Sequence, residues 1–217
     1  MTNEFATPAP EERHAEAPEA APQVACRRVF LVRHADALEG PRDHELGRHL
    51  TALGRRQADA LARRLAKWKV DAIVCSDKHR SYETALAVHR FHPGVPLLVD
   101  AMFREVSRRN LEAHARGDEK QIDLPERLQA AWDRIATLTH EVTVAIVHSG
   151  LIKYFLGRII KCEGMLKPRF HSTETGITCF QMRPQGPMLE FFNDTHHLTP
   201  EIVSPGPKAP WLEPRRG

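Results

Sequence analysis

The sequence predicts an α/β fold, a three-layer α/β/α sandwich around a mainly parallel central sheet. Two apolar and β-branched runs, residues 29–32 and 142–147, have the composition of buried strands, and each leads into a histidine, His34 or His148. Segments with helical spacing of apolar residues lie between and after these runs. We expect both histidines at the carboxyl edge of the sheet, where open α/β sheets place their ligand crevice.

The first half of the chain predicts two further helices and a strand. A helix is expected from the N-cap Thr51, because apolar residues between 58 and 68 repeat at i, i+3, i+4 and i+7. The run 71–75, which is apolar after Asp71, predicts a short strand. Ser76 or Asp77 is expected to cap the next helix, so that Arg80 lies in its first turn.

The second half continues the alternation and ends in a hairpin. Residues 95–99 predict an edge strand, because Pro96 has no N–H to donate to a neighbouring strand. Helices are expected from Asp123, an N-cap, to about residue 138, and over residues 151–161 after the second histidine. Two runs between residues 176 and 192, joined by a Pro- and Gly-containing turn, predict an antiparallel hairpin.

Composition limits the class of protein. The 31 basic residues nearly balance 28 acidic ones, so the net charge of +3 does not call for a nucleic-acid partner. The four cysteines lack the close spacing of zinc or redox pairs and are expected to be reduced thiols: Cys26, Cys75, Cys162 and Cys179. The histidine pairs at 89/92 and 196/197 lack a matching carboxylate or cysteine set, so no metal site is predicted there.

The ends of the chain differ from its centre. Residues 1–26 are rich in Ala, Pro and Glu and predict a disordered tail, and residues 200–217 predict a second, Pro-rich tail. The folded domain is therefore expected over residues 27–199. Because the sequence contains no signal-like or membrane-spanning apolar segment, we expect a cytoplasmic protein without a membrane partner. The oligomeric state does not follow from the sequence.

The residues around the two histidines suit phosphate chemistry. A neutral imidazole can attack phosphorus when its tautomer is fixed and cations neutralise the phosphoryl oxygens. Arg33, Arg80 and His148 could supply that charge, since guanidinium groups match the geometry of phosphate. A carboxylate could protonate the leaving oxygen.

Five segments resemble, in the same order, motifs of the histidine phosphatase superfamily, the phosphoglycerate-mutase-like enzymes. The resemblance spans about residues 28–198. The segments are Leu31-Val32-Arg33-His34-Ala35 (with Ala35 in place of the usual Gly), residues 50–58 (Leu-Thr-x-x-Gly-x-x-Gln-Ala), residues 76–85 (Ser-x-x-x-Arg-Ser-x-x-Thr-Ala), Val147-His148-Ser149-Gly150, and residues 193–198.

This resemblance implies a role for each matching residue. His34 would be the phosphorylated nucleophile, and Arg33, Arg80 and His148 would complete the phosphate pocket. The family's acid–base residue is matched by Glu105 in Phe-Arg-Glu. Two other acids, Glu112 and Asp118, are fallback candidates. The resemblance implies no metal ion and no organic cofactor.

The resemblance favours a phosphatase that acts on a phosphorylated small metabolite or a phosphoprotein. After the first motif, residues 36–40 lack the Thr and Asn that would contact a phosphoglycerate in the mutases, so mutase activity is the weaker alternative. Ala35 is similar to the branch that acts on phosphohistidine. A non-catalytic phospho-ligand binding module is the third alternative. Arginines 104, 108, 109 and 116 could read a second anionic group or simply form a solvated basic loop.

Overall fold

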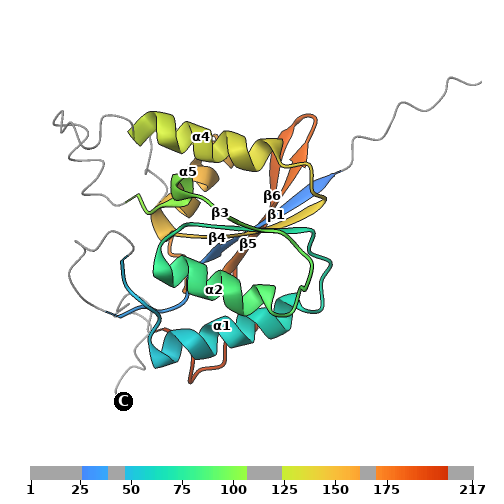
Figure 1. The fold of residues 1–217 in the computed structure, drawn as a ribbon. Helices are drawn as coiled ribbons and strands as arrows, with labels where there is room; N and C mark the ends of the chain where they lie inside the picture. Colours follow the sequence, from blue (N-terminus) through green and yellow to red (C-terminus); the bar gives the residue numbers. More distant parts are fainter. Residues whose placement is uncertain (1–25, 39–46, 107–123, 162–169, 205–217) are drawn as a thin grey trace, which may run out of the picture.

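The computed structural model describes residues 26–38, 47–106, 124–161 and 170–204. These residues form a six-stranded mixed sheet in the order β3-β2-β4-β1-β5-β6 with helices on both faces (Figure 1). The predicted α/β fold with a mainly parallel sheet is therefore confirmed. In chain order the elements are β1 (Arg27–Arg33), α1 (Ala52–Leu65), β2 (Ala72–Cys75), α2 (His79–His89), β3 (Leu97–Val99), a 3₁₀ turn (Ala101–Phe103), α4 (Leu124–Thr137), β4 (Val142–Val147), α5 (Ser149–Ile159), β5 (Ile177–Arg183) and β6 (Gly186–Asp194).

The alternation of side chains along β1 divides the core in two. Val29 and Leu31 point to the layer of α4 and α5, where they join the apolar cluster that includes Trp132. Phe30 and Val32 point to the opposite layer and pack with α1 and α2. Because both faces of this strand are buried, its sequence is a continuous apolar run rather than an alternating one.

Strand register decides where the site lies. β1 and β4 pair in parallel, with Arg33 opposite Val147. The next residue of each strand is a histidine, so the pairing brings His34 and His148 to the same edge of the sheet. The remaining strands agree with the sequence: β3 lies at the sheet edge, and β5 and β6 form the expected antiparallel hairpin.

The helix starts agree with the sequence only in part. Thr51 caps α1 by accepting a hydrogen bond from the Gly54 N–H at 2.9 Å, as predicted. The expected cap of α2 by Ser76 or Asp77 is wrong: Lys78 is the N-cap residue and makes no side-chain cap hydrogen bond. The Asp77 carboxylate instead binds Arg104, which removes it from the helix end.

The ends of the described chain bear on the predicted tails. β1 begins at Arg27, where the folded domain was expected to begin. At the other end, Ile202 is buried and its carbonyl accepts a hydrogen bond from Gln57 Nε2 at 2.9 Å. The packed chain therefore extends beyond residue 199, at least to Ile202. Asp123, the expected cap of α4, and Cys162 lie outside the described residues. In the described part of the chain, no helix combines the length and apolarity that crossing a bilayer requires.

Candidate active site

Two histidines meet where β1 and β4 end. The His34 backbone N–H donates to the Val147 carbonyl at 2.9 Å, which continues the sheet pairing by one residue. The two imidazole rings then lie edge to face, with 5.1 Å between the centroids of His34 and His148. The parallel register thus produces directly the side-by-side histidine pair expected from the sequence.

The contacts of His34 define one tautomer. Its Nδ1 lies 2.7 Å from the carbonyl oxygen of Ala35, so Nδ1 carries the hydrogen and donates it. Its Nε2 accepts a hydrogen bond from Arg80 Nε at 3.0 Å, which requires a lone pair on Nε2. Burial, followed by the positive charge of Arg80, holds the pKa of His34 well below its usual value. The ring is therefore neutral, and Nε2 is the nitrogen that carries the lone pair.

The first turn of α2 places Arg80 against this nitrogen. Thr84, one turn later, donates from Oγ1 to the Arg80 carbonyl at 2.7 Å and accepts the Ala35 N–H at 3.1 Å. This hydroxyl ties α2 to Ala35, the residue after His34. Gly47 also approaches Arg80: a Cβ at that glycine would lie 3.1 Å from an Arg80 terminal nitrogen. Thr84 thus fixes the backbone of Arg80, and Gly47 leaves room for its guanidinium.

His148 is completely buried at the start of α5. Burial, and then the neighbouring His34, hold its pKa well below the usual value. Neither of its ring nitrogens has a hydrogen-bond partner among the described residues. Buried polar atoms in proteins are normally paired, so a ligand atom is a natural partner for this ring.

Arg33 takes part in an ion pair that the sequence did not predict. It donates to the Ser172 carbonyl at 2.6 Å and pairs with the Glu174 carboxylate at 2.5 Å. Thr175, the next residue, has a positive φ of 59° and donates its N–H to the Arg33 carbonyl at 3.0 Å. A β-branched residue in this conformation is strained, and such strain is typical of functional sites. No local pattern signals this contact, because Glu174 lies before a strand at the far end of the chain.

Glu105 lies at the N-terminus of α5. One carboxylate oxygen accepts the Gly150 and Val106 N–H groups, each at 2.9 Å. Loss of hydration raises the pKa of Glu105, although these hydrogen bonds and the nearby arginines oppose the shift. A carboxyl group with a raised pKa can hold a proton for the leaving oxygen nearer neutral pH than a free glutamate does.

Gly150 makes this position of the carboxylate possible. A Cβ at that glycine would lie 1.8 Å from the Val106 carbonyl oxygen and 2.6 Å from Glu105 Oε1. Only a residue without a side chain lets the Glu105 segment lie this close to the helix. Gly150 is the last residue of the second histidine motif, which is the signal in the sequence that points to its role.

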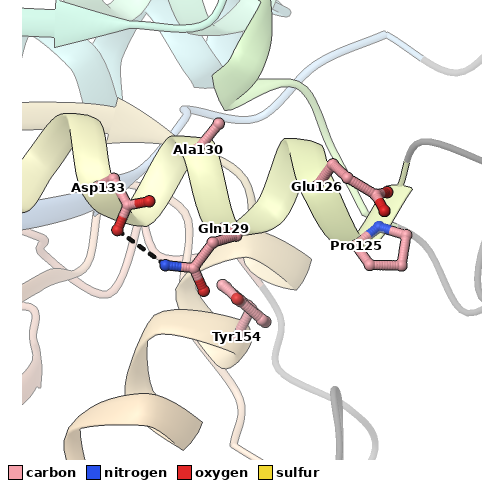
Figure 2. Close-up of a pocket in the computed structure, with 6 residues that line it drawn as sticks. All are labelled: Pro125, Glu126, Gln129, Ala130, Asp133 and Tyr154. Atoms are coloured by element: carbon pink, nitrogen blue, oxygen red, sulfur yellow. Dashed lines mark hydrogen bonds between the residues drawn. The ribbon is translucent and has the colours of Figure 1, made fainter.

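The remaining sequence candidates fall elsewhere. Arg104 binds Asp77 bidentately, with nitrogen–oxygen distances of 2.5 to 3.0 Å. This ion pair holds the segment around Arg104 against the start of α2. The other three loop arginines and the fallback acids Glu112 and Asp118 lie outside the described residues. A surface groove between α4 and α5 contains none of the predicted site residues (Figure 2). Its lining is Pro125, Glu126, Gln129, Ala130, Asp133 and Tyr154.

Comparison with known proteins decides the family. The family model described as histidine phosphatase superfamily (branch 1) matches residues 29–121 and 107–195, which together cover most of the chain. The chain belongs to the histidine phosphatase superfamily. The resemblance drawn from the five motifs is thereby confirmed.

The relatives within the superfamily are phosphatases. The serine/threonine-protein phosphatase PGAM5, mitochondrial, of Xenopus tropicalis is 28% identical over 193 residues, which cover 83% of this chain and 69% of the relative. A phosphoserine phosphatase mutant from Entamoeba histolytica, solved with phosphoserine, has a TM-score of 0.61 at 20% identity and covers 80% of this chain and 100% of its own. The mycobacterial glucosyl-3-phosphoglycerate phosphatase has a TM-score of 0.60 at 20% identity, with 77% and 98% covered. These structural matches support the fold.

Proposed function

We propose that this histidine phosphatase hydrolyses phosphomonoesters through a covalent phosphohistidine on His34. The observation that carries the proposal is the contact between His34 Nε2 and Arg80 Nε at 3.0 Å. A neutral, buried imidazole presents its lone pair directly beside a guanidinium that can bind the phosphoryl oxygens. The membership in the superfamily and the phosphatase relatives support the same reaction class.

In the first step, Nε2 of His34 attacks phosphorus in line with the leaving oxygen. The N–P bond forms as the P–O bond to the alcohol breaks, and protonated Glu105 gives its proton to the leaving oxygen. Arg80, Arg33 and His148 stabilise the charge on the phosphoryl oxygens, and positioning of this kind accounts for most of the catalysis in phosphoryl transfer.

In the second step, water replaces the imidazole. The Glu105 carboxylate takes a proton from the water as its oxygen attacks phosphorus, and the electron pair of the breaking P–N bond returns to Nε2. Inorganic phosphate leaves, and the enzyme regains its protonated carboxyl and neutral ring. The hydrogen bond from Nδ1–H of His34 to the Ala35 carbonyl oxygen, with 2.7 Å between nitrogen and oxygen, keeps Nε2 available in both steps.

The position of Glu105 argues against a pure binding module. Such a module needs cations for a phosphate group but has no use for a nucleophile together with a proton donor. Here the carboxyl group of Glu105, whose pKa is raised, accepts a hydrogen bond from the backbone N–H of Gly150, two residues after His148. Mutase activity remains the less favoured alternative, because residues 36–40 lack the expected phosphoglycerate contacts. The substrate class, the cytoplasmic location and the lack of nucleic-acid or membrane partners remain predictions.

The test is turnover by the purified protein beside His34→Ala, with a chelator present. The panel contains p-nitrophenyl phosphate, sugar phosphates, phosphoglycerates, phosphoserine, a phosphoserine peptide and a phosphohistidine peptide. We expect hydrolysis by the wild type and none by His34→Ala, and an acid-labile phosphate on the peptide containing His34 after rapid quenching. The exposed His196→Ala serves as the matched control and should turn over normally. Activity in folded His34→Ala would overturn the assignment.

A further inference from the structure

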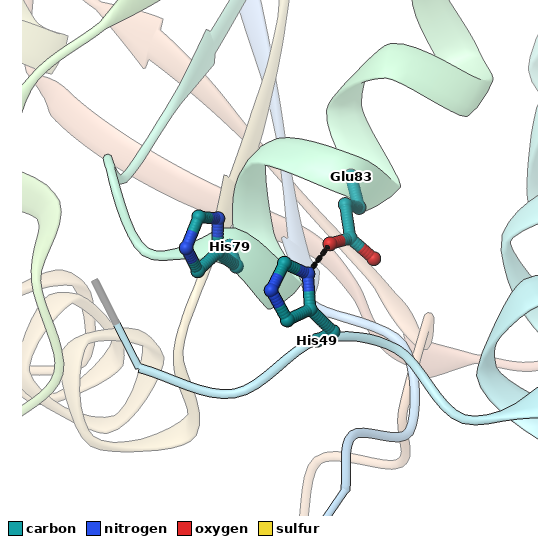
Figure 3. Close-up of side chains that lie close together, drawn as sticks. All are labelled: His49, His79 and Glu83. Carbon is teal, nitrogen blue, oxygen red and sulfur yellow. Dashed lines mark hydrogen bonds and ion pairs between the residues drawn. The ribbon is translucent and has the colours of Figure 1, made fainter. Parts of the chain in front are cut away.

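A second cluster of polar side chains lies outside the phosphate pocket. His79 and Glu83 are four residues apart in α2 and so share one face of the helix. His49, from the segment before α1, lies against them (Figure 3). One ligand atom from each of the three side chains can be chosen so that all three lie within 4.8 Å of one another. None of the three has a part in the phosphatase chemistry described above.

We propose that His49, His79 and Glu83 bind a divalent transition-metal ion, with Zn²⁺ the best match. Two imidazoles and one carboxylate are a ligand set that zinc uses, with a water completing its tetrahedral coordination. Mg²⁺ and Ca²⁺ fit less well, since these ions prefer sites made of oxygen atoms. The site stands apart from the proposed function, because it does not require the phosphatase to be active.

The carboxylate is already oriented for this role. One Glu83 oxygen accepts the Leu50 N–H at 3.0 Å, and the other pairs with His49 Nδ1. Metal ligands are commonly held in this way by a further hydrogen bond, which fixes the direction of the free lone pair. A metal ion would take the place of the hydrogen between His49 Nδ1 and Glu83, and His49 would bind it as the neutral tautomer with its hydrogen on Nε2.

The two imidazoles are close enough to join the same ion after a small adjustment. The rings of His49 and His79 are stacked, with centroids 4.2 Å apart and planes 19° apart. Nitrogen lone pairs lie in the ring plane, so parallel rings must turn before both can point at one ion. His49 can do so because 61% of its side chain is exposed to solvent. That exposure also leaves a coordination position open for water.

The site would join two segments that border the phosphate pocket. His79 directly precedes Arg80, and Gly47, two residues before His49, lies against the Arg80 guanidinium. A metal ion held by His49 and His79 would therefore fasten the segment around Gly47 to the first turns of α2. Metal occupancy and the position of Arg80 are linked through this short stretch of backbone.

Metal binding can be measured directly on the full-length protein without substrate. Co²⁺ gives a visible absorption band in tetrahedral sites, and calorimetry with Zn²⁺ gives the affinity and stoichiometry. We expect one tight equivalent on the wild type and a loss of affinity of roughly tenfold or more in His79→Ala. Zn²⁺ should also raise the Tm of the wild type more than that of the variant.

Two further variants keep the result interpretable. Glu83→Gln retains an oxygen to accept the Leu50 N–H but removes the charge, so it should fold and bind Zn²⁺ more weakly. His196→Ala breaks another exposed histidine–carboxylate pair, the one with Asp194, and should bind Zn²⁺ like the wild type. Equal affinities in His79→Ala, Glu83→Gln and the wild type would overturn the proposal. So would the absence of a one-to-one complex.

Discussion

The Gly150→Ala substitution tests whether the position of Glu105 matters for turnover. The added methyl carbon would lie 1.8 Å from the Val106 carbonyl oxygen, whereas ordinary contacts begin at 3.4 Å. The Glu105–Val106 segment must therefore move away from α5 by about 1.6 Å, and a misplacement of about 1 Å can cost about 10²-fold in rate. Overpacking of this kind costs about 1–3 kcal/mol of stability, which lowers the Tm by roughly 2–12 °C for a chain of this size.

The assay is kcat on p-nitrophenyl phosphate well below the Tm of the variant, with the fold checked by circular dichroism. Gly94→Ala is the control, because Gly94 has a φ of +86° and no atom within 4 Å of the added carbon. It should lose about 1 kcal/mol of stability from backbone strain while keeping its kcat. A folded Gly150→Ala with kcat within about twofold of the wild type, against the 10²-fold expected, would refute the role of Glu105 as acid and base.

Three further predictions follow from the charges and burial of single groups. Because burial lowers the pKa of His34, an NMR titration of its ring should show a midpoint well below 6.5. The free energy of unfolding should then fall as the pH drops below 6.5, because the unfolded chain takes up the proton first, and a midpoint at or above 6.5 contradicts this. Glu174→Gln removes the negative charge that pairs with Arg33, so Arg33 should bind phosphate more strongly and the inhibition constant of inorganic phosphate should fall about two- to fivefold. Unchanged or weaker inhibition would mean that Glu174 only positions the guanidinium. Burial raises the pKa of Cys75 to about 12, so iodoacetamide at pH 8 should label the exposed Cys26 and leave Cys75 unmodified, which peptide mass spectrometry can check.

The sequence predicts well those features that depend on neighbouring residues. Buried strands, the Thr51 cap and the edge position of β3 all follow from local patterns, and the structure has each of them. The meeting of His34 and His148 is predicted because parallel strands end at one edge of a sheet. Glu105 is placed by a weaker match, and its contact with Gly150 supports that match without testing its role.

Contacts between distant segments are what the sequence does not predict. The ion pair between Arg33 and Glu174 depends on how the segment before β5 crosses the end of β1, and no periodicity encodes that crossing. Similarly, His79 and Glu83 are recognisable as a helical i, i+4 pair, but the third side chain, His49, comes from a segment without regular structure. The cap of α2 differs from the prediction for a related reason, because Arg104, from another part of the chain, binds the Asp77 carboxylate.

The position of His34 and the packing of the core depend on one strand register. Arg33 lies opposite Val147, and a slip of β1 by one residue would turn Leu31 and Val32 to the opposite faces of the sheet. The same slip would separate His34 from His148, because each histidine directly follows its strand. Selection for a well-packed sheet therefore also maintains the histidine pair. The carboxylates Glu105 and Glu174 are held by loop segments and a helix end, so their positions depend on contacts outside the β1–β4 register.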